Sequence, residues 1–399
     1  MQPALKQSAA PDQGQLGTVD VTRPTHELPL DVALRKMAEV AKGSALKVMR
    51  EYATLAFGPG QVSFSDYTKL RLFDDAFYAG SDKRTVVGQR RNFDIDLTIN
   101  YRHDWMGLFS NKVASASYLA AHGFPTIPVS AIYAKDLAGA SHVVARNKDD
   151  LRAFLVNEAN YPLFGKPIEG IQSLGSIGLK RYLPGTDSLE TIDGREVPLD
   201  HFMLDIDQHY GHGYLFQKFL TPHPAIRTVC GDRPATVRIV TLACEGEPKV
   251  FRACWKIPTG SNVADNYWRP GNLLAQIDIT SGRVQRVTSG TGLDLTEHTH
   301  HPDTKAQLVG MEVPNWTRLS QTAVEAARLM RHMPLIGWDM ALLETGPVIV
   351  EMNEKPDFFL NQLADGRGVL DEELTTFIKS QKKKATDRVR SIKRQVHQL

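Results

Sequence analysis

The chain has 399 residues, of which 42% are hydrophobic and 23% are charged, and its formal net charge is +2. This composition is typical of a globular protein with an ample core, and so small a net charge argues against a dedicated nucleic-acid-binding protein. The three cysteines, Cys230, Cys244 and Cys254, are odd in number and form no C-x-x-C pair, which argues against a disulfide framework or a zinc ribbon and favours a reducing, cytoplasmic compartment.

The N-terminal part of the chain is predicted to be disordered over residues 1–25 and helical over 26–110. The first segment is polar and lacks the apolar stretch of a signal peptide. In the second, apolar residues recur at helical spacing before a stop at 58–60: Leu30, Leu34, Met37, Val40 and Ala41. Another helix is predicted over 111–121. No later apolar run reaches the roughly 18 residues that a membrane span requires.

From residue 129 the pattern becomes mixed α and β. The predicted strands cover 129–133, 163–166, 214–219, 235–243, 249–255, 273–278, 339–343 and 348–352. An amphipathic helix is predicted over 316–331. Residues 371–399 are predicted to form a basic helix or tail. A solvated face is the usual reason for its Lys382-Lys383-Lys384 run, and weak peripheral contact with an acidic membrane surface is the alternative.

The strongest chemical signal lies near the C-terminus, where 337–342 and 348–353 form two predicted strands joined by a turn. Side chains alternate along a strand, so Glu351 and Asn353 share one face while Val350 and Met352 belong to the core. Asp339 on the partner strand can face the first pair. Two carboxylates and an amide oxygen suit Mg²⁺ together with phosphate oxygens. An acidic, solvated hairpin face is the alternative, and the apolar flanks argue against it.

Two further segments suggest nucleotide binding. Residues 163–167 form a strand that ends near Lys166, and a Gly/Ser-rich loop over 169–178 could bring backbone N–H groups to phosphate oxygens. No Walker A motif occurs, and a flexible surface turn remains the alternative. Residues 214–220 could present backbone groups to an adenine edge or could be a plain buried strand.

Charged residues interrupt the strands that follow. Arg238 lies in an otherwise apolar strand, so it needs either a ligand or an ion-pair partner, and both remain open. Lys256 ends the next strand. The segment 262–272, which contains Arg269, has the polar composition of a substrate-facing loop. The histidines near residue 300 favour a surface loop over a zinc site.

Taken in this order, these segments resemble the ATP-grasp superfamily, especially its sugar-transfer-associated group. The resemblance covers roughly 111–370 and is carried by 337–341, 351–356 and 366–368, with 301–304 and 314–316 upstream. It implies an α+β ATP-grasp fold in which two α+β subdomains hold ATP, preceded by a helical extension. The small subdomain would cover 111–220 and the large one 221–370.

The resemblance also implies roles for individual residues. The phosphates would be held by two lysines and a flexible loop, namely Lys112, Lys166, Ser173, Gly175 and Ser176. Adenine would be contacted by Gln217, Lys218 and Leu220. Magnesium would be held by Asp339, Glu351 and Asn353. The transferring phosphoryl group and the substrate would be faced by Arg238, Lys256 and Arg269. Gln217 stands where many relatives have Glu, and Gly337 stands where many ligases have Arg.

The implied reaction is ATP- and Mg²⁺-dependent ligation of a small-molecule carboxylate to an amine or thiol, with release of ADP and phosphate. The group's association suggests polysaccharide or cell-envelope biosynthesis, by analogy alone. Two alternatives stay open: a phosphotransferase on the same fold, and a non-catalytic nucleotide-binding scaffold of a polysaccharide assembly system.

Overall fold

A computed structural model describes residues 29–137, 142–169, 175–244, 246–262 and 264–396. The predicted disordered segment 1–25 lies outside these ranges. The described chain forms two compact units, which we call unit 1 (128–219) and unit 2 (29–127 and 220–396). Each unit is built on a sheet, and helices precede the first strand at Val129, so the expected α+β class with a helical N-terminal region is confirmed. Residues 111–127, which the sequence placed in the small subdomain, lie in unit 2.

The helical N-terminal region belongs to unit 2. Its elements are α1 (Leu30–Val40), α2 (Ala45–Ala56), α3 (Phe64–Lys69), η1 (Lys83–Thr85), α4 (Gln89–Ile99), η2 (His103–Trp105), α5 (Met106–Ser110) and α6 (Lys112–Ala121). Polar N-caps start several of these helices: Ser63 and Asp66 form a capping box on α3. Asn111 accepts hydrogen bonds from the backbone of Val113 and Ala114 and so starts α6.

Unit 1 contains a seven-stranded sheet in the order β2-β1-β7-β3-β4-β5-β6 among the described residues. Its elements are β1 (Val129–Tyr133), β2 (Val144–Ala145), α7 (Lys148–Leu155), η3 (Glu158–Asn160), β3 (Leu163–Pro167), β4 (Ile177–Leu183), β5 (Ser188–Thr191), β6 (Glu196–Pro198), α8 (Leu199–His209) and β7 (Tyr214–Lys218). Apolar residues of α7 and α8, including Leu151 and Phe202, pack with Leu163 and Phe216 of the sheet and form its core.

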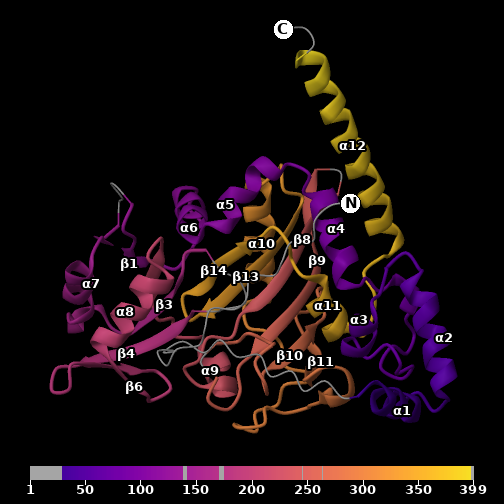
Figure 1. Cartoon of the computed structure of the whole chain (residues 1–399), viewed down its shortest axis with the longest axis horizontal. Coiled ribbons are helices and arrows are strands. Elements are labelled where there is room, and N and C mark those ends of the chain that lie inside the picture. Colours follow the sequence, from indigo (N-terminus) through magenta and orange to yellow (C-terminus); the bar gives the residue numbers. More distant parts are fainter. Residues whose placement is uncertain (1–28, 138–141, 170–174, 245, 263, 397–399) are drawn as a thin grey trace. The chain divides into compact units, whose positions relative to one another are not determined.

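Unit 2 contains the second sheet, in the order β12-β11-β10-β9-β8-β13-β14 (Figure 1). Its elements are α9 (Pro224–Cys230), β8 (Val237–Cys244), β9 (Glu247–Ile257), β10 (Leu273–Ile277), β11 (Val284–Ser289), η4 (Gly292–Asp294), β12 (Thr296–Glu297), α10 (Trp316–Leu329), β13 (Leu335–Leu343), β14 (Gly346–Asn353), α11 (Phe358–Asp365) and α12 (Glu372–Val396). Every neighbouring pair in this sheet is antiparallel.

The two faces of the unit 2 sheet have different partners. The apolar face packs against α10, where Val237, Trp255 and Trp338 join Leu319 and Ala323 in one core. The opposite face is covered in part by α11 and by the N-terminal helices. There Cys254 and Leu274 pack with Leu70, Phe73 and Leu363. The N-terminal region is therefore part of the same folded unit as the sheet.

The last helix, α12, packs against α4 through its first turns, where Leu374 and Phe377 join Ile95 and Ile99. Arg388 in its C-terminal half pairs with Asp104 of η2 at 3.8 Å, and the end of the helix projects beyond the other elements of unit 2 (Figure 1). Within the described ranges, no helix combines the length and the apolar run that crossing a membrane requires.

Candidate functional site: an ionic row on the unit 2 sheet

The predicted hairpin forms, and its register brings the expected metal residues together. Asp339 of β13 lies opposite Glu351 of β14, and Gly337 lies opposite Asn353. Directly paired residues of antiparallel strands project to the same face, so the two carboxylates and the amide share one face. The prediction that Val350 belongs to the core is wrong. A register shift follows Asp339, and Ile349 takes the buried position while Val350 is half-buried.

Arg238 of β8 lies opposite Asp339 on the next strand and binds it through both side-chain oxygens. The Nε–Oδ1 distance is 2.6 Å and the Nη2–Oδ2 distance is 2.9 Å. Arg238 also donates through Nη1 to the Pro356 carbonyl at 2.8 Å. Both charged side chains are only about a tenth exposed. Of the two interpretations that the sequence left open for Arg238, the ion pair is therefore present; a further role toward a ligand stays a proposal.

Lys256 of β9 joins the same cluster from the other side. Its Nζ lies 3.3 Å from Asp339 Oδ1 and 4.0 Å from Asp265 Oδ1. Asp265 is fixed in turn because it accepts a hydrogen bond of 2.5 Å from the backbone N–H of Thr236. The buried Asn272 holds the loop that carries Asp265, since its amide donates to the carbonyls of Ala264 and Asn266. Two buried cations thus face two carboxylates, and the cluster is neutral as a whole.

The electrostatics follow from burial and pairing. Burial alone would raise the pKa of Asp339, but the charges of Arg238 and Lys256 outweigh it and hold the pKa below its ordinary value. Burial raises the pKa of Asp265, only partly offset by Lys256. Burial raises the pKa of Cys254 to about 12, so this thiol, which lies opposite Arg238, is not a nucleophile.

Lys112 extends the row at the other end. It is the first residue of α6, which contacts β14, and its Nζ lies 3.6 Å from Glu351 Oε1. The Asn353 amide donates to the Gly337 carbonyl at 3.3 Å, which leaves its oxygen directed away from that bond. We call these side chains the ionic row; its members are Lys112, Glu351, Asp339, Arg238 and Lys256.

The oxygen atoms on this face of the sheet are of the kind that a magnesium ion takes. Among the described residues, Asp339 Oδ1 is shared by Arg238 and Lys256, whereas Oδ2 accepts a hydrogen bond from Arg238 Nη2 alone and keeps a lone pair. Glu351 and Asn353 supply further oxygens on the same face. Within the described residues, no group of three or more His, Cys, Asp and Glu side chains is arranged to hold a metal. The residues therefore fit an ion that takes few protein oxygens and completes its shell with phosphate and water, as Mg²⁺ does.

Three of the predicted nucleotide residues in unit 1, Lys166, Gln217 and Lys218, lie on one strand pair. Lys166 of β3 and Gln217 of β7 are buried and lie on the same face, because Gln217 is paired with Phe164, two residues before Lys166. Lys218 is exposed and alternates to the opposite face. Gly175 has φ +78°, and an added Cβ would come within 2.7 Å of Pro167 and Tyr210, so only glycine fits there. Ser176 follows it and is half-buried.

The remaining predicted positions have less defined surroundings. Ser173 lies outside the described residues. Leu220, half-buried, begins the second stretch of unit 2, and Arg269 is half-buried in the loop between β9 and β10. The disfavoured zinc site is not formed by the described histidines. His298 bonds to Ser289 through Nε2 at 2.8 Å, and His301 is buried with Nε2 on the Pro258 carbonyl at 3.0 Å.

Sequence reasoning missed the buried amides that hold the backbone at the ends of β13 and β14. The fully buried Asn100 donates to the carbonyls of Leu335 and Glu354 at 2.7 and 2.8 Å, and so connects the start of β13 to the end of β14. Asn92 accepts from the Phe358 backbone at 3.3 Å. A polar residue among the apolar positions of α4 is the only local signal, and it does not identify the partner.

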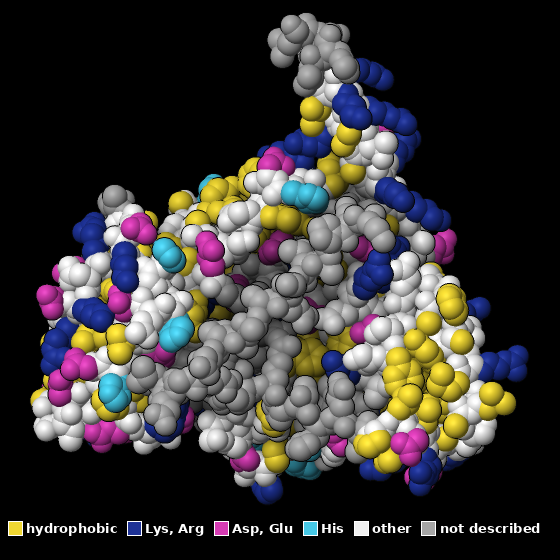
Figure 2. Space-filling view, in the orientation of Figure 1, with side chains coloured by type: hydrophobic (Ala, Val, Ile, Leu, Met, Phe, Trp, Pro, Cys, Tyr) yellow, Lys and Arg dark blue, Asp and Glu magenta, His cyan; other side chains and the backbone are white. Residues whose placement is uncertain are grey.

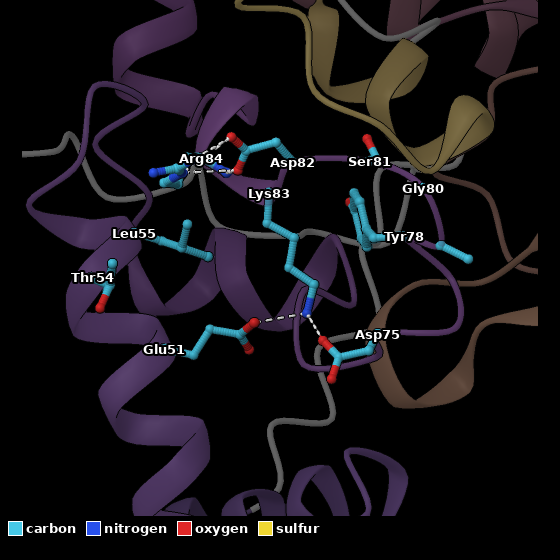
Figure 3. A pocket seen from close by; sticks show the side chains of 11 residues that line it. Glu51, Thr54, Leu55, Asp75, Tyr78, Gly80, Ser81, Asp82, Lys83 and Arg84 are labelled. Carbon is cyan, nitrogen blue, oxygen red and sulfur yellow. Dashed lines mark hydrogen bonds and ion pairs between the residues drawn. The ribbon is translucent and has the colours of Figure 1, made fainter.

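One pocket of about 400 Å³ lies apart from the row, between α2 and residues 75–84 (Figure 3). Its charged side chains pair with one another. Lys83 Nζ lies 2.7 Å from Glu51 and 2.5 Å from Asp75, and Arg84 lies 2.8 Å from Asp82. This pairing stabilises the loop that follows α3 and gives the pocket no reactive group.

Residues 207–378, which include β8, β9, β13 and β14, match the family model described as sugar-transfer associated ATP-grasp. No curated protein matches the chain. The similarity to this family thus covers residues 207–378 of the chain.

Solved structures that resemble the chain include ligases. The D-alanine-D-alanine ligase of Coxiella burnetii is 12% identical with a TM-score of 0.40, over 73% of this chain and 62% of that one. The D-alanine-D-alanine ligase of Bacillus anthracis is 12% identical with a TM-score of 0.37, over 71% and 69%. The L-amino acid ligase of Bacillus licheniformis is 12% identical with a TM-score of 0.35, over 70% and 51%. The chain thus spans less than two thirds of the first and the last of these.

Proposed function

We propose that the protein is a Mg²⁺-dependent, ADP-forming ligase that joins a small-molecule carboxylate to an amine. The observation that carries the proposal is the ionic row, in which two adjacent carboxylates are flanked by cations along one face of the unit 2 sheet. A row of both signs suits a reaction in which a negatively charged phosphoryl group moves between two oxygens. The family description supports the ATP-dependent class.

The proposed chemistry has two steps. A carboxylate oxygen of the acid attacks the γ-phosphorus of ATP, the bond to the β,γ-bridging oxygen breaks, and ADP leaves. The amine nitrogen then attacks the acyl carbon, the bond to the phosphate oxygen breaks, and the amine releases a proton. Lys112, Arg238 and Lys256 would stabilise negative charge in both steps, because their cations are fixed before the substrates arrive. Magnesium, held by Glu351, Asn353 and Asp339 Oδ2, would neutralise phosphate charge when bound.

The decisive test follows one oxygen atom. Candidate acids and amines are first screened for ADP release with Mg²⁺ present, and the active acid is then labelled with oxygen-18 in its carboxylate. The proposal expects label in inorganic phosphate and ADP as the nucleotide product. Label in AMP would show an adenylating enzyme. Turnover without any amine, with a stable phosphorylated acid as the product, would show a phosphotransferase, and metal-independent ATP binding without hydrolysis would support a scaffold.

We further propose that Lys166 and Gln217 contribute to ATP binding from unit 1. A lysine at the edge of a Gly/Ser loop acts as a point charge toward phosphate. We expect Lys166→Ala to weaken binding of a non-hydrolysable ATP analogue by about tenfold or more, since hydrogen bonds to charged groups contribute about 1.5–3 kcal/mol. Titration calorimetry measures this. Lys180→Ala, an exposed lysine on β4, is the matched control, and equal affinities in all three proteins would remove Lys166 from the site.

The substrates and location belong to the same proposal. The family description, sugar-transfer associated ATP-grasp, supports a role linked to sugar transfer, and we propose sugar acids, amino acids or peptides of polysaccharide or cell-envelope synthesis as the substrates. All three cysteines are free, which suits a reducing cytoplasm where ATP is available.

A further inference from the structure

The C-terminal half of α12 carries an apolar stripe that continues beyond the folded core. Leu374 and Ile378 are buried against the rest of unit 2. Ala385, seven residues after Ile378 on the same side of the helix, is half-buried. Positions 378, 385, 389 and 392 fall on one side of an α-helix, because they are spaced by seven, four and three residues. Val389 and Ile392 are nevertheless 53% and 46% exposed. The stripe thus leaves the core and continues without cover from the described residues of unit 2.

Basic side chains surround this stripe. Between residues 379 and 394 the helix has eight basic residues and one acidic residue, Asp387. Lys382 and Lys393 border one side of the stripe at helical spacing, and Lys384 and Arg388 border the other. Figure 2 shows Lys and Arg side chains along the projecting part of the helix. Of these, Arg388 and Arg390 have acidic partners at 3.8 and 3.7 Å, so most of the positive charge is not balanced by ion pairs in the described structure.

We infer that this part of α12 binds the surface of a membrane that contains anionic lipids, with Val389 and Ile392 at the level of the headgroups. A narrow apolar stripe bordered by Lys and Arg is the arrangement with which interfacial helices meet anionic lipid. A second copy of the chain would bring an equally cationic helix against the first, and the like charges would repel. A nucleic acid would satisfy the charge and leave the stripe uncovered.

The test is sedimentation of the full chain with vesicles. We expect about tenfold or more binding to phosphatidylcholine–phosphatidylglycerol vesicles than to phosphatidylcholine alone, because each basic residue near an anionic surface adds to the attraction. Binding should fall between about 0.1 M and about 0.5 M salt, since surface charges are screened. Val389→Ser with Ile392→Ser, and separately Lys382→Gln with Lys383→Gln and Lys384→Gln, should each lower the bound fraction.

A matched triple variant controls for charge alone. Arg35→Gln, Lys36→Gln and Lys42→Gln remove three exposed cations from α1 and the turn after it, and should leave vesicle binding unchanged. An equal loss in both triple variants would overturn the inference, as would equal binding to neutral and anionic vesicles. Two further results would also overturn it: a dimer that the serine pair dissociates without any change in vesicle binding, and tight binding to DNA that survives the serine pair. Thermal unfolding confirms that each variant is folded.

Discussion

The two faces of the unit 2 sheet use the same four strands for opposite purposes. On one face Val237, Trp255, Trp338 and Ile349 are buried in a single core beneath α10. On the other face, two carboxylates on β14 and β13 lie beside two cations on the adjacent strands β8 and β9. Because side chains alternate along each strand, a single residue step separates Trp338 in the core from Asp339 in the ionic row. The strands therefore place a rigid apolar support directly behind the charges.

The charged side chains can pair only when the fold brings their strands together. The apolar core, in contrast, does not depend on the charges. An apolar face needs only residues of suitable size and period. Arg238 and Asp339 are 101 positions apart in sequence, and each would be costly to bury alone. Their pairing requires β8 and β13 to be neighbours in one fixed register.

The largest expected effect comes from Glu351→Gln, which removes a charge from the row without changing the side chain's shape. If Glu351 holds the metal, we expect kcat/KM to fall by about a thousandfold, or about 4 kcal/mol, with the unfolding free energy nearly unchanged. Steady-state ADP release at saturating Mg²⁺ measures it. Glu344→Gln makes the same change at the exposed turn of the same hairpin and should keep full activity. Normal turnover of Glu351→Gln would end the metal assignment.

The second prediction concerns the stability of the buried pair. Asp339→Asn leaves Arg238 and Lys256 facing only Asp265, so we expect a loss of about 3 kcal/mol or more in the free energy of unfolding. Arg238→Met should cost less, because Lys256 still faces Asp339 and Asp265, whose pKa is already raised by burial, can take up a proton. Urea denaturation at neutral pH measures both.

The double variant separates pairing from packing. Asp339→Asn with Arg238→Met restores a neutral cluster of Lys256 and Asp265, so its loss should be smaller than the sum of the two single losses. Additive losses would mean that the two side chains do not interact across the strands. We expect the double variant to be inactive even though it folds, because the row would have lost two of its charges.

Much of the sheet could be predicted from local pattern. The predicted strand 235–243 corresponds to β8, 249–255 to the middle of β9, and 316–331 to α10. The spacing and the number of apolar residues were sufficient to predict these three elements. By contrast, β4, β5 and β6 were not predicted. The exposed and buried positions of β4 and β5 do not alternate regularly, β6 has only three residues, and the pairing of all three strands is decided by neighbours in space.

The site was predictable by residue type and only partly by geometry. The grouping of Asp339, Glu351 and Asn353 followed from alternation and a tight turn. The bulge at Val350 did not, since an extra residue in a strand leaves no mark on composition. Asn100 could not be predicted either, because its partners Leu335 and Glu354 are 235 and 254 positions away. The hydrogen bonds exist only once the whole unit has formed.

A smaller effect is expected on the apolar face. Ile349→Val removes one buried methylene group, and we expect a loss of about 1 kcal/mol in the free energy of unfolding. Val350→Ala, at the half-buried bulge next to it, should cost less. The activity of both folded variants should match the parent protein, which urea titration and ADP release measure together. A large loss of activity in Ile349→Val alone would mean that the two faces are not independent.

The smallest expected effect concerns Asp96, a buried acid that, unlike Asp339, has no cation in direct contact among the described residues. Asp96 on α4 is fully buried, its Oδ1 has no hydrogen-bond partner among the described residues, and Asn92 donates to Oδ2 at 3.3 Å. Burial, reinforced by the nearby Asp357, raises its pKa well above the ordinary value, although Lys355 acts in the opposite direction. The folded state therefore keeps this proton at pH values where the unfolded chain has already released it.

The sign of the pH dependence follows from that difference. Above a pH of about 4, where an unfolded Asp ionises, the folded state binds more protons than the unfolded state, so stability falls as the pH rises toward the folded pKa. Asp96→Asn cannot ionise, and its unfolding free energy should lack this slope. In urea titrations between about pH 5 and pH 8, we expect the unfolding free energy of the variant to rise relative to that of the parent protein as the pH increases. Asp94→Asn, exposed on the same helix, is the control and should run parallel to the parent. If Asp96→Asn also runs parallel, Asp96 is ionised in the folded state, and a bound cation must then supply the charge balance that Arg238 and Lys256 give to Asp339.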